Sequence, residues 1–91
     1  MELTANLVLQ KTKVDNLSLV KNLNLWGTDI TDISIVKQLP NIEVLALSVN
    51  HIRSLRDIGE CPSLKELYLR KNDVSDLAEV QFLTKLPNLT V

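Results

Sequence analysis

The sequence predicts an α/β repeat fold, in which a short parallel sheet forms a concave side and helical or 3₁₀ segments form a convex side. Two observations predict it. Of the 91 residues, 33 are Leu, Val or Ile, whereas only three are aromatic. The same order of apolar and polar residues also recurs about every 22 residues. Such a period is typical of stacked repeats, in which each unit buries its apolar edge against its neighbours.

Three consecutive units align in one frame, at 20–41, 42–63 and 64–88, and residues 89–91 open a fourth. The apolar columns include Leu23, Leu45 and Leu67; Leu25, Leu47 and Leu69; and Ile30, Ile52 and Val74. The polar column between the last two holds Thr28, Asn50 and Asn72. This LxxLxLxxNxIxxL pattern is the leucine-rich repeat signature. It predicts a leucine-rich repeat solenoid of the 22-residue class.

Each unit contains a short predicted strand followed by a turn. Leu23, Asn24 and Leu25 alternate between apolar and polar, so the two Leu side chains point inward and Asn24 points outward. Stacked units pair such strands in parallel, and the rest of each unit supplies the crossover that a parallel pair needs. The Asn column lies where the chain leaves the strand. Its amides can satisfy backbone groups that the turn would otherwise bury unpaired.

The return side of each unit is predicted to hold a short helix or 3₁₀ turn. Asp32, Ser54 and Asp76 share one column and are favoured N-cap types, so they should mark where these segments begin. A residue before Pro is pushed out of the helical region, which predicts where the segments end. The pairs concerned are Leu39-Pro40, Cys61-Pro62 and Leu86-Pro87. Three extra residues near 81–85 fit about one further helical turn.

The two ends of the chain differ from the repeats at 20–91. Residues 1–19 do not fit the strand frame. Thr4, followed by apolar side chains at positions 7, 8 and 14, predicts a short amphipathic helix that caps the first repeat. At Val91 the fourth unit stops before its strand, with no C-terminal cap. We therefore expect these residues to be part of a longer protein.

Charge and composition argue against several classes of function. Ten Lys and Arg against 11 Asp and Glu give a net charge of −1, which disfavours binding to nucleic acid or to an acidic membrane. No apolar run is long enough to span a membrane, and the N-terminus is a poor signal peptide. One Cys cannot form an internal disulfide, which favours a reducing compartment. One His and two Gly leave little material for catalysis, so we expect neither an enzyme nor a cofactor.

Single residues that could carry chemistry have plainer explanations. Cys61 falls in the apolar column that precedes Pro, so it is expected to be a buried structural residue. His51 lies in the turn and is expected to be exposed and inert. Four turn carboxylates lack the spacing and central Gly of a calcium loop, so no metal site is expected. They are Asp29, Asp32, Asp73 and Asp76.

A binding function would belong to the concave face. Alternate strand positions project from it, and adjacent strands lie ~4.8 Å apart, so these positions form rows across the sheet. Asn24, Ala46 and Tyr68 form one row, and Trp26, Ser48 and Arg70 form the next. Trp, Tyr and Arg are enriched at interface hot spots, and the small residues between them would leave a shallow groove for a partner's side chain. We predict these six residues as the protein-binding site.

Two alternatives stay open for these residues. Trp26 could lean onto the N-terminal helix and complete the cap there. Tyr68 and Arg70 could be ordinary surface residues that stack on each other. Either arrangement would remove the side chain concerned from the binding surface.

Several stretches that the repeat consensus does not dictate resemble one family. The most specific are Trp26-Gly27, Thr31-Asp32-Ile33-Ser34 and Leu47-Ser48-Val49-Asn50. Others are Leu23-Asn24-Leu25, Glu43-Val44, Glu66-Leu67-Tyr68-Leu69-Arg70, Leu3-Thr4, Val8-Leu9 and Leu86-Pro87-Asn88-Leu89. In these residues the whole chain resembles the N-terminal domain of the cilia- and flagella-associated leucine-rich repeat proteins, a basal-body ciliopathy family.

This resemblance implies a non-catalytic scaffold for assembly or maintenance of the cilium or flagellum, located in the cytoplasm at the basal body. It also implies a longer chain, with further repeats, a linker and a C-terminal helical module for oligomerisation. The partner it implies is a NIMA-related kinase, bound by the full-length protein, and that contact could belong to the region beyond Val91. It assigns no binding residue within this chain.

Two other functions fit the same repeats. The chain could be a regulatory subunit that docks a phosphatase, kinase or motor enzyme in the cytosol, and acidic and aromatic residues in further concave repeats would favour this. It could instead be a spliceosomal-type repeat domain that orients an RNA-binding partner. Nuclear enrichment and a basic tail in the complete chain would favour that function.

Overall fold

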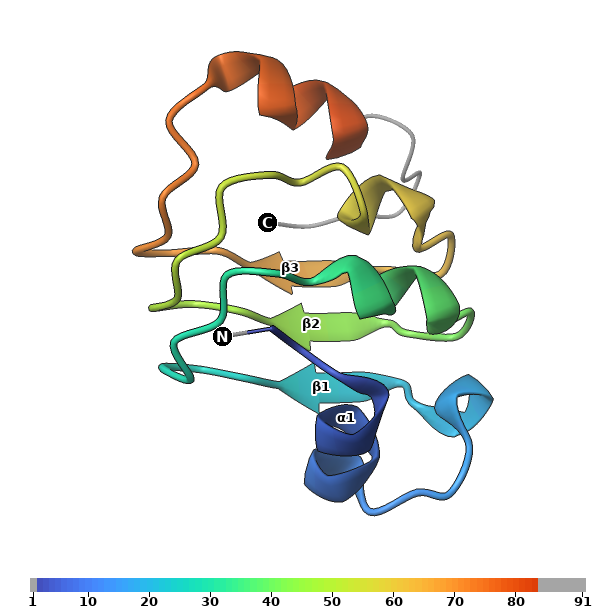
Figure 1. The fold of residues 1–91 in the computed structure, drawn as a ribbon. Coiled ribbons are helices and arrows are strands. Elements are labelled where there is room, and N and C mark those ends of the chain that lie inside the picture. The colour runs from blue at the N-terminus through green and yellow to red at the C-terminus, as the bar shows by residue number, and fades with distance from the viewer. Residues whose placement is uncertain (1, 84–91) are drawn as a thin grey trace.

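Three short parallel strands form one side of the computed structural model, which describes residues 2–83 (Figure 1). The strands are β1 (Asn22–Asn24), β2 (Val44–Ala46) and β3 (Glu66–Tyr68), and they lie in the order β1-β2-β3. Leu23 pairs with Leu45, and Leu45 with Leu67, so each strand sits in the register that the apolar columns predict.

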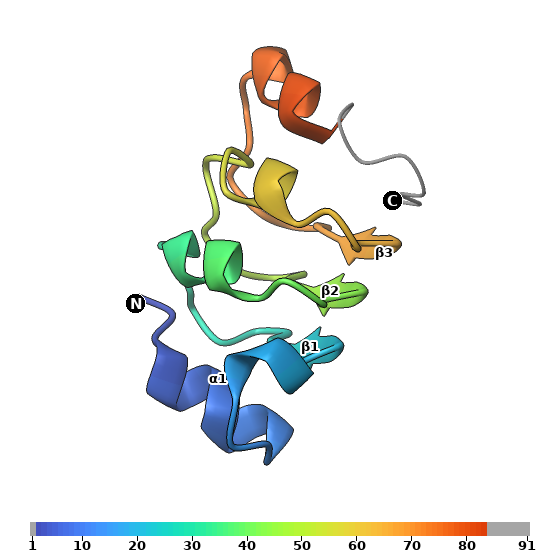
Figure 2. The same cartoon turned by 90° about the vertical axis from the view of Figure 1, so that its right-hand side faces the viewer.

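The helical segments lie on the other side of the molecule from the strands (Figure 2). Helix α1 (Ala5–Thr12) packs beside β1. The 3₁₀ helices are η1 (Leu17–Leu19), η2 (Ser34–Gln38), η3 (Ile58–Glu60) and η4 (Leu77–Leu83). A small parallel sheet with helical and 3₁₀ segments is therefore confirmed. Thr4 caps α1 as predicted, because its hydroxyl oxygen accepts a hydrogen bond from the Leu7 amide (3.2 Å).

The apolar columns form one core between the two sides. Every column position named above is buried in the first two units, from Leu23 and Leu45 at the strand to Ile30 and Ile52 beyond the turn. In the third unit Leu67 is buried, whereas the Leu69 and Val74 side chains are only partly buried and pack against the core. Burial thus decreases in the third unit, whose strand β3 is one of the two edge strands of the described sheet.

The Asn column joins neighbouring units through buried hydrogen bonds. Asn50 is the buried polar side chain of residues 2–83, with 3% of its surface exposed. Its Nδ2 donates to the carbonyls of Leu25 and Leu47 (both 2.9 Å), and its Oδ1 accepts from the amide of Ile30 (2.9 Å). Asn72 repeats this pattern one unit later, with the Leu47 and Leu69 carbonyls and the Ile52 amide. Each amide therefore satisfies backbone groups of two units at once, as predicted.

The three residues of the predicted N-cap column accept hydrogen bonds as N-caps do. The prediction that they mark where the 3₁₀ helices begin is wrong for two of the three helices. Asp32 and Asp76 each accept a hydrogen bond from the amide two residues later, at 2.8 and 2.9 Å, and Ser54 does so at 3.3 Å. However, η2 is preceded by Ile33, and η3 begins four residues after Ser54. These side chains therefore stabilise the turn that enters each return segment. Only η4 starts directly after its column residue.

A column of left-handed backbone follows each strand. Gly27, Val49 and Lys71 occur at the same place in successive units and have φ angles of 63°, 61° and 60°. This region favours Gly and costs L-residues about 1–2 kcal/mol. The amides of Gly27 and Val49 still continue the parallel ladder, donating to the carbonyls of Ser48 (3.0 Å) and Arg70 (2.7 Å). The ladder thus extends beyond the strands and keeps the next row of side chains in register.

The Cys61 thiol is buried in the core, which confirms the structural role predicted for it. Its Sγ lies 3.5 Å from the carbonyl oxygen of Val36 in the preceding unit. Burial, with smaller contributions from the carboxylates of Asp57 and Glu60, raises the pKa of this thiol to about 11. The thiol therefore stays protonated and unreactive near neutral pH.

Some predicted features lie outside the described residues. They are the end of the third unit, the Leu86-Pro87 pair, part of the insertion near 81–85, and the start of a fourth unit at 89–91.

We expect loss of the Asn50 amide to be the most destabilising polar change in the sheet. Asn50→Ala should lower the free energy of unfolding by about 3 kcal/mol, because it leaves several buried backbone groups unpaired. Asn72→Ala should cost less, since Asn72 is only half-buried. Urea unfolding followed by circular dichroism measures both. The control is Asn22→Ala on the exposed side of β1, and an equal effect of all three substitutions would contradict this assignment.

A second expectation concerns pH. The raised pKa means that the folded protein holds the Cys61 proton more tightly than the unfolded chain does. The stability that follows is complete below about pH 9 and is lost as the pH rises towards 11, by about 2–3 kcal/mol in total. Urea unfolding at pH 8 to 11 should show a steeper alkaline loss for the natural protein than for Cys61→Ala. Parallel curves for the two proteins would show that the thiol does not titrate in this way.

Candidate functional site

The side chains that project outward from the strands form a surface that we call the outer sheet face. It consists of Asn22, Asn24, Trp26, Val44, Ala46, Ser48, Glu66, Tyr68 and Arg70. Within it, Asn24, Ala46 and Tyr68 pair directly across the strands. The extended ladder aligns Trp26, Ser48 and Arg70 in the same way. All six predicted site residues therefore lie on one face, in two adjacent rows.

Large exposed side chains flank small ones on this face. Trp26, beyond β1, is 65% exposed, and Tyr68 on β3 is 47% exposed. Ala46 and Ser48, between them, are half-buried and short. An exposure of 65% disfavours the alternative in which Trp26 packs onto α1 as part of the cap. The face thus presents two aromatic side chains, one on each side of β2, whose own side chains here are short.

A pocket of about 360 Å³ opens beside β3, where the described sheet ends. Its lining consists of Ser48, Leu67, Tyr68, Leu69 and Arg70. Three of the six predicted residues therefore meet at one hollow, and the other three, Asn24, Trp26 and Ala46, lie outside it. The lining combines aliphatic groups and a phenol ring with one guanidinium.

Two of the predicted site residues, Asn24 and Tyr68, form hydrogen bonds within the protein. The Oδ1 of Asn24 accepts from the backbone amide of Trp26 (3.1 Å), so Asn24 shapes the turn that carries the indole. The hydroxyl of Tyr68 donates to Oε1 of Glu66 (2.6 Å), and this hydrogen bond raises the pKa of Tyr68. The hydroxyl of Tyr68 is thus held by Glu66 on its own strand.

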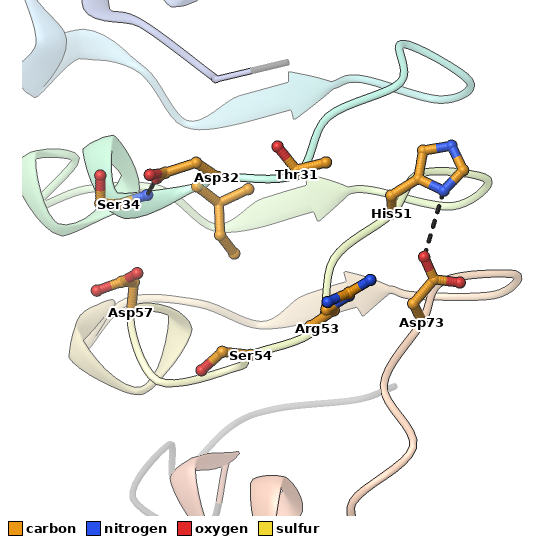
Figure 3. Close-up of a pocket in the computed structure, with 9 residues that line it drawn as sticks. Thr31, Asp32, Ser34, His51, Arg53, Ser54, Asp57 and Asp73 are labelled. Carbon is orange, nitrogen blue, oxygen red and sulfur yellow. Dashed lines mark hydrogen bonds and ion pairs between the residues drawn. The ribbon is translucent and has the colours of Figure 1, made fainter.

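A second and larger pocket, of about 620 Å³, lies near the turns rather than on the outer sheet face (Figure 3). Its polar lining includes Asp32, His51, Arg53, Asp57 and Asp73. Hydrogen bonds from the amide and hydroxyl of Ser34 hold the pKa of the Asp32 carboxyl below its usual range. The pocket therefore mixes cationic and anionic groups, with carboxylates in the majority.

His51 is exposed, as expected, and it also makes two contacts that the sequence analysis did not predict. Nε2 lies 2.8 Å from Oδ1 of Asp29. Nδ1 lies 3.2 Å from Oδ2 of Asp73, a contact that Figure 3 shows. Asp29, His51 and Asp73 occupy one column in three successive units. Their shared column could have indicated the contact, because side chains in one column of stacked repeats lie next to each other.

No helix within residues 2–83 is long and apolar enough to cross a membrane. Over the same residues, no three His, Cys, Asp or Glu side chains are placed together so as to hold a metal ion.

Comparison with known proteins identifies the repeats. A family model described as Leucine Rich repeats (2 copies) matches residues 40–79. The whole chain is 46% identical to the human Cilia- and flagella-associated protein 410 and 44% identical to the mouse protein of that name. It is also 46% identical, over 89 residues, to an uncharacterized protein of Caenorhabditis elegans, of which the match covers 19%.

The chain spans only 36% of the length of the human and mouse proteins, although all of its own residues take part in the match. The chain therefore carries leucine-rich repeats, and its predicted resemblance to the cilia- and flagella-associated leucine-rich repeat proteins is confirmed along its whole length.

Proposed function

We propose that this chain is a non-catalytic protein-interaction module of the cilium or flagellum, and that its partner binds the outer sheet face. One observation carries the proposal. Trp26, Ser48 and Arg70 share a row in which the two large side chains are exposed, and a partly apolar pocket opens beside that row. Exposed Trp, Tyr and Arg around a hollow are the residue types that dominate binding energy at protein interfaces.

The relatives support the cellular setting. The human and mouse proteins are named as associated with cilia and flagella, and the chain is similar to both over its full length. Within this setting we propose a scaffold at the basal body, in the cytoplasm. We also propose that the units form a 22-residue solenoid capped by residues 1–19, with the outer sheet face as its concave side. Binding of a NIMA-related kinase, and oligomerisation through a region beyond Val91, are proposals for the full-length protein.

Two double variants test the proposed surface with matched chemistry. Tyr68→Ala/Arg70→Glu removes one ring and reverses one charge on the outer sheet face. His51→Ala/Arg53→Glu removes one ring and reverses one charge at the pocket near the turns. Each would be expressed in the full-length protein in ciliated cells, and captured proteins would be quantified by mass spectrometry. We expect the first variant to lose specific ciliary proteins by at least about tenfold, because loss of even one hot spot of about 2 kcal/mol weakens binding by more than that.

Thermal melting must first show that both variants fold like the natural protein. Trp26→Ala, measured separately, shows whether the row extends to β1 or ends at the pocket. If the variant at the pocket near the turns loses the ciliary proteins and the outer-face variant keeps them, the binding surface is the other one. If both keep them, the interaction belongs to a part of the full-length protein outside these residues, and the proposal fails.

A further inference from the structure

The ring of His51 lies between two carboxylates, one from the unit before its own and one from the unit after it. Nε2 faces Oδ1 of Asp29 at 2.8 Å, and Nδ1 faces Oδ2 of Asp73 at 3.2 Å. Figure 3 shows His51 and Asp73 beside the pocket near the turns. The backbone fixes their positions, because the amide of His51 donates to the carbonyl of Ile30 (2.9 Å) and the amide of Asp73 to that of Ile52 (3.0 Å). The stacking of the turns therefore brings the three side chains together.

The two contacts require a proton on each ring nitrogen of His51. A neutral imidazole has one N–H donor, and its other nitrogen carries a lone pair that can only accept. An ionised carboxylate also only accepts, so a neutral ring would set a lone pair against a carboxylate oxygen at one of the two contacts. An imidazolium donates from both nitrogens and is attracted to both carboxylates. The geometry thus suits the charged ring at both contacts and the neutral ring at only one.

The other charged groups near His51 do not reverse this preference. His51 lines the pocket near the turns, and the further charged side chains of that lining are Asp32, Arg53, Asp57 and Asp73. Arg53 has the same charge as an imidazolium and disfavours it. Asp57 lies 3.6 Å from Lys37, so its charge is already balanced. Because opposite charges in direct contact favour the charged form of a group, the two carboxylates that touch the ring have the largest effect.

We infer that folding favours the imidazolium form of His51, which links the turns of three consecutive units in a proton-dependent way. The unfolded chain does not hold these side chains together, so the link stabilises only the folded protein. It is present between the pH ranges in which free Asp and free His titrate, ~4 and ~6.5. It is lost as the pH rises further, because the ring loses a proton and one contact becomes repulsive. This inference concerns the turns and does not depend on the proposed function.

The first test measures the protonation of the ring directly. His51 is the one His of the sequence, so ¹⁵N-histidine labelling gives nuclear magnetic resonance signals from this ring alone. The ¹⁵N chemical shifts distinguish an imidazolium from the neutral tautomers. At pH 7 the natural chain should hold at least about twice the imidazolium fraction of Asp29→Asn/Asp73→Asn, which lacks both opposite charges. Asp15→Asn removes the same charge from an exposed residue between α1 and η1, and it should leave the fraction unchanged.

The second test measures the effect on stability by urea unfolding at pH 8 and pH 5.5. On going to the lower pH, the urea midpoint of the natural chain should rise relative to that of His51→Gln, whose polar side chain does not titrate. Asp29→Asn and Asp73→Asn, measured singly, should each reduce this rise, because each removes one of the two contacts. Circular dichroism at both pH values checks that every variant is folded.

Three results would overturn the inference. The first is an equal imidazolium fraction in the natural chain and in the variant that lacks both carboxylates. The second is the same pH dependence of stability in the natural chain and in His51→Gln, or an effect of only one of the two Asp substitutions, since the ring would then link two units at most. The third is an equal fall of the imidazolium fraction in Asp15→Asn, which would mean that net charge alone is responsible.

Discussion

The side-chain amides of Asn50 and Asn72 fix the turn of each unit to the unit before it. Each amide donates to two strand-end carbonyls 22 residues apart, and its oxygen accepts an amide from the preceding turn. Because a one-residue shift would break all of these hydrogen bonds, the amides set the register in which β1, β2 and β3 pair. The rows of side chains on the outer sheet face follow the same register. The buried hydrogen bonds of the two Asn side chains therefore determine how the exposed side chains of that face are aligned.

The left-handed residues that follow each strand keep the candidate site in the same register as the strands. Gly27 suits its φ of 63°, but Val49 adopts 61° with a β-branched side chain, which is unusual for this region. Two interactions hold it there: its amide donates to the Arg70 carbonyl, and Asn50, the next residue, is buried in its hydrogen bonds. Backbone strain at a non-Gly residue persists where the surroundings over-determine the conformation. Here that conformation aligns Ser48 with Arg70 and so builds one wall of the pocket.

Features that recur at the same position of every unit could be predicted from the sequence. Features that depend on the course of the backbone between those positions could not. The strands, the inward Leu23 and Leu45, the Asn contacts and the burial of Cys61 all follow from column positions, since stacking repeats them in every unit. The starts of η2 and η3 do not, because each depends on how many residues the chain needs to reach the core again after its turn. The six site residues were placed on one face by alternation alone.

The two surfaces differ in what a ligand must displace. Near the turns, His51 is already paired with Asp29 and Asp73, and Lys37 lies 3.6 Å from Asp57, so a charged ligand there competes with existing partners. On the outer sheet face, the guanidinium of Arg70 and the indole NH of Trp26 have no hydrogen-bonding partner within residues 2–83, and the rings of Trp26 and Tyr68 are exposed. Binding energy comes from groups that gain contacts without losing equal ones. That difference, and not pocket volume, favours the outer sheet face, since His51 and Asp57 near the turns already have charged partners.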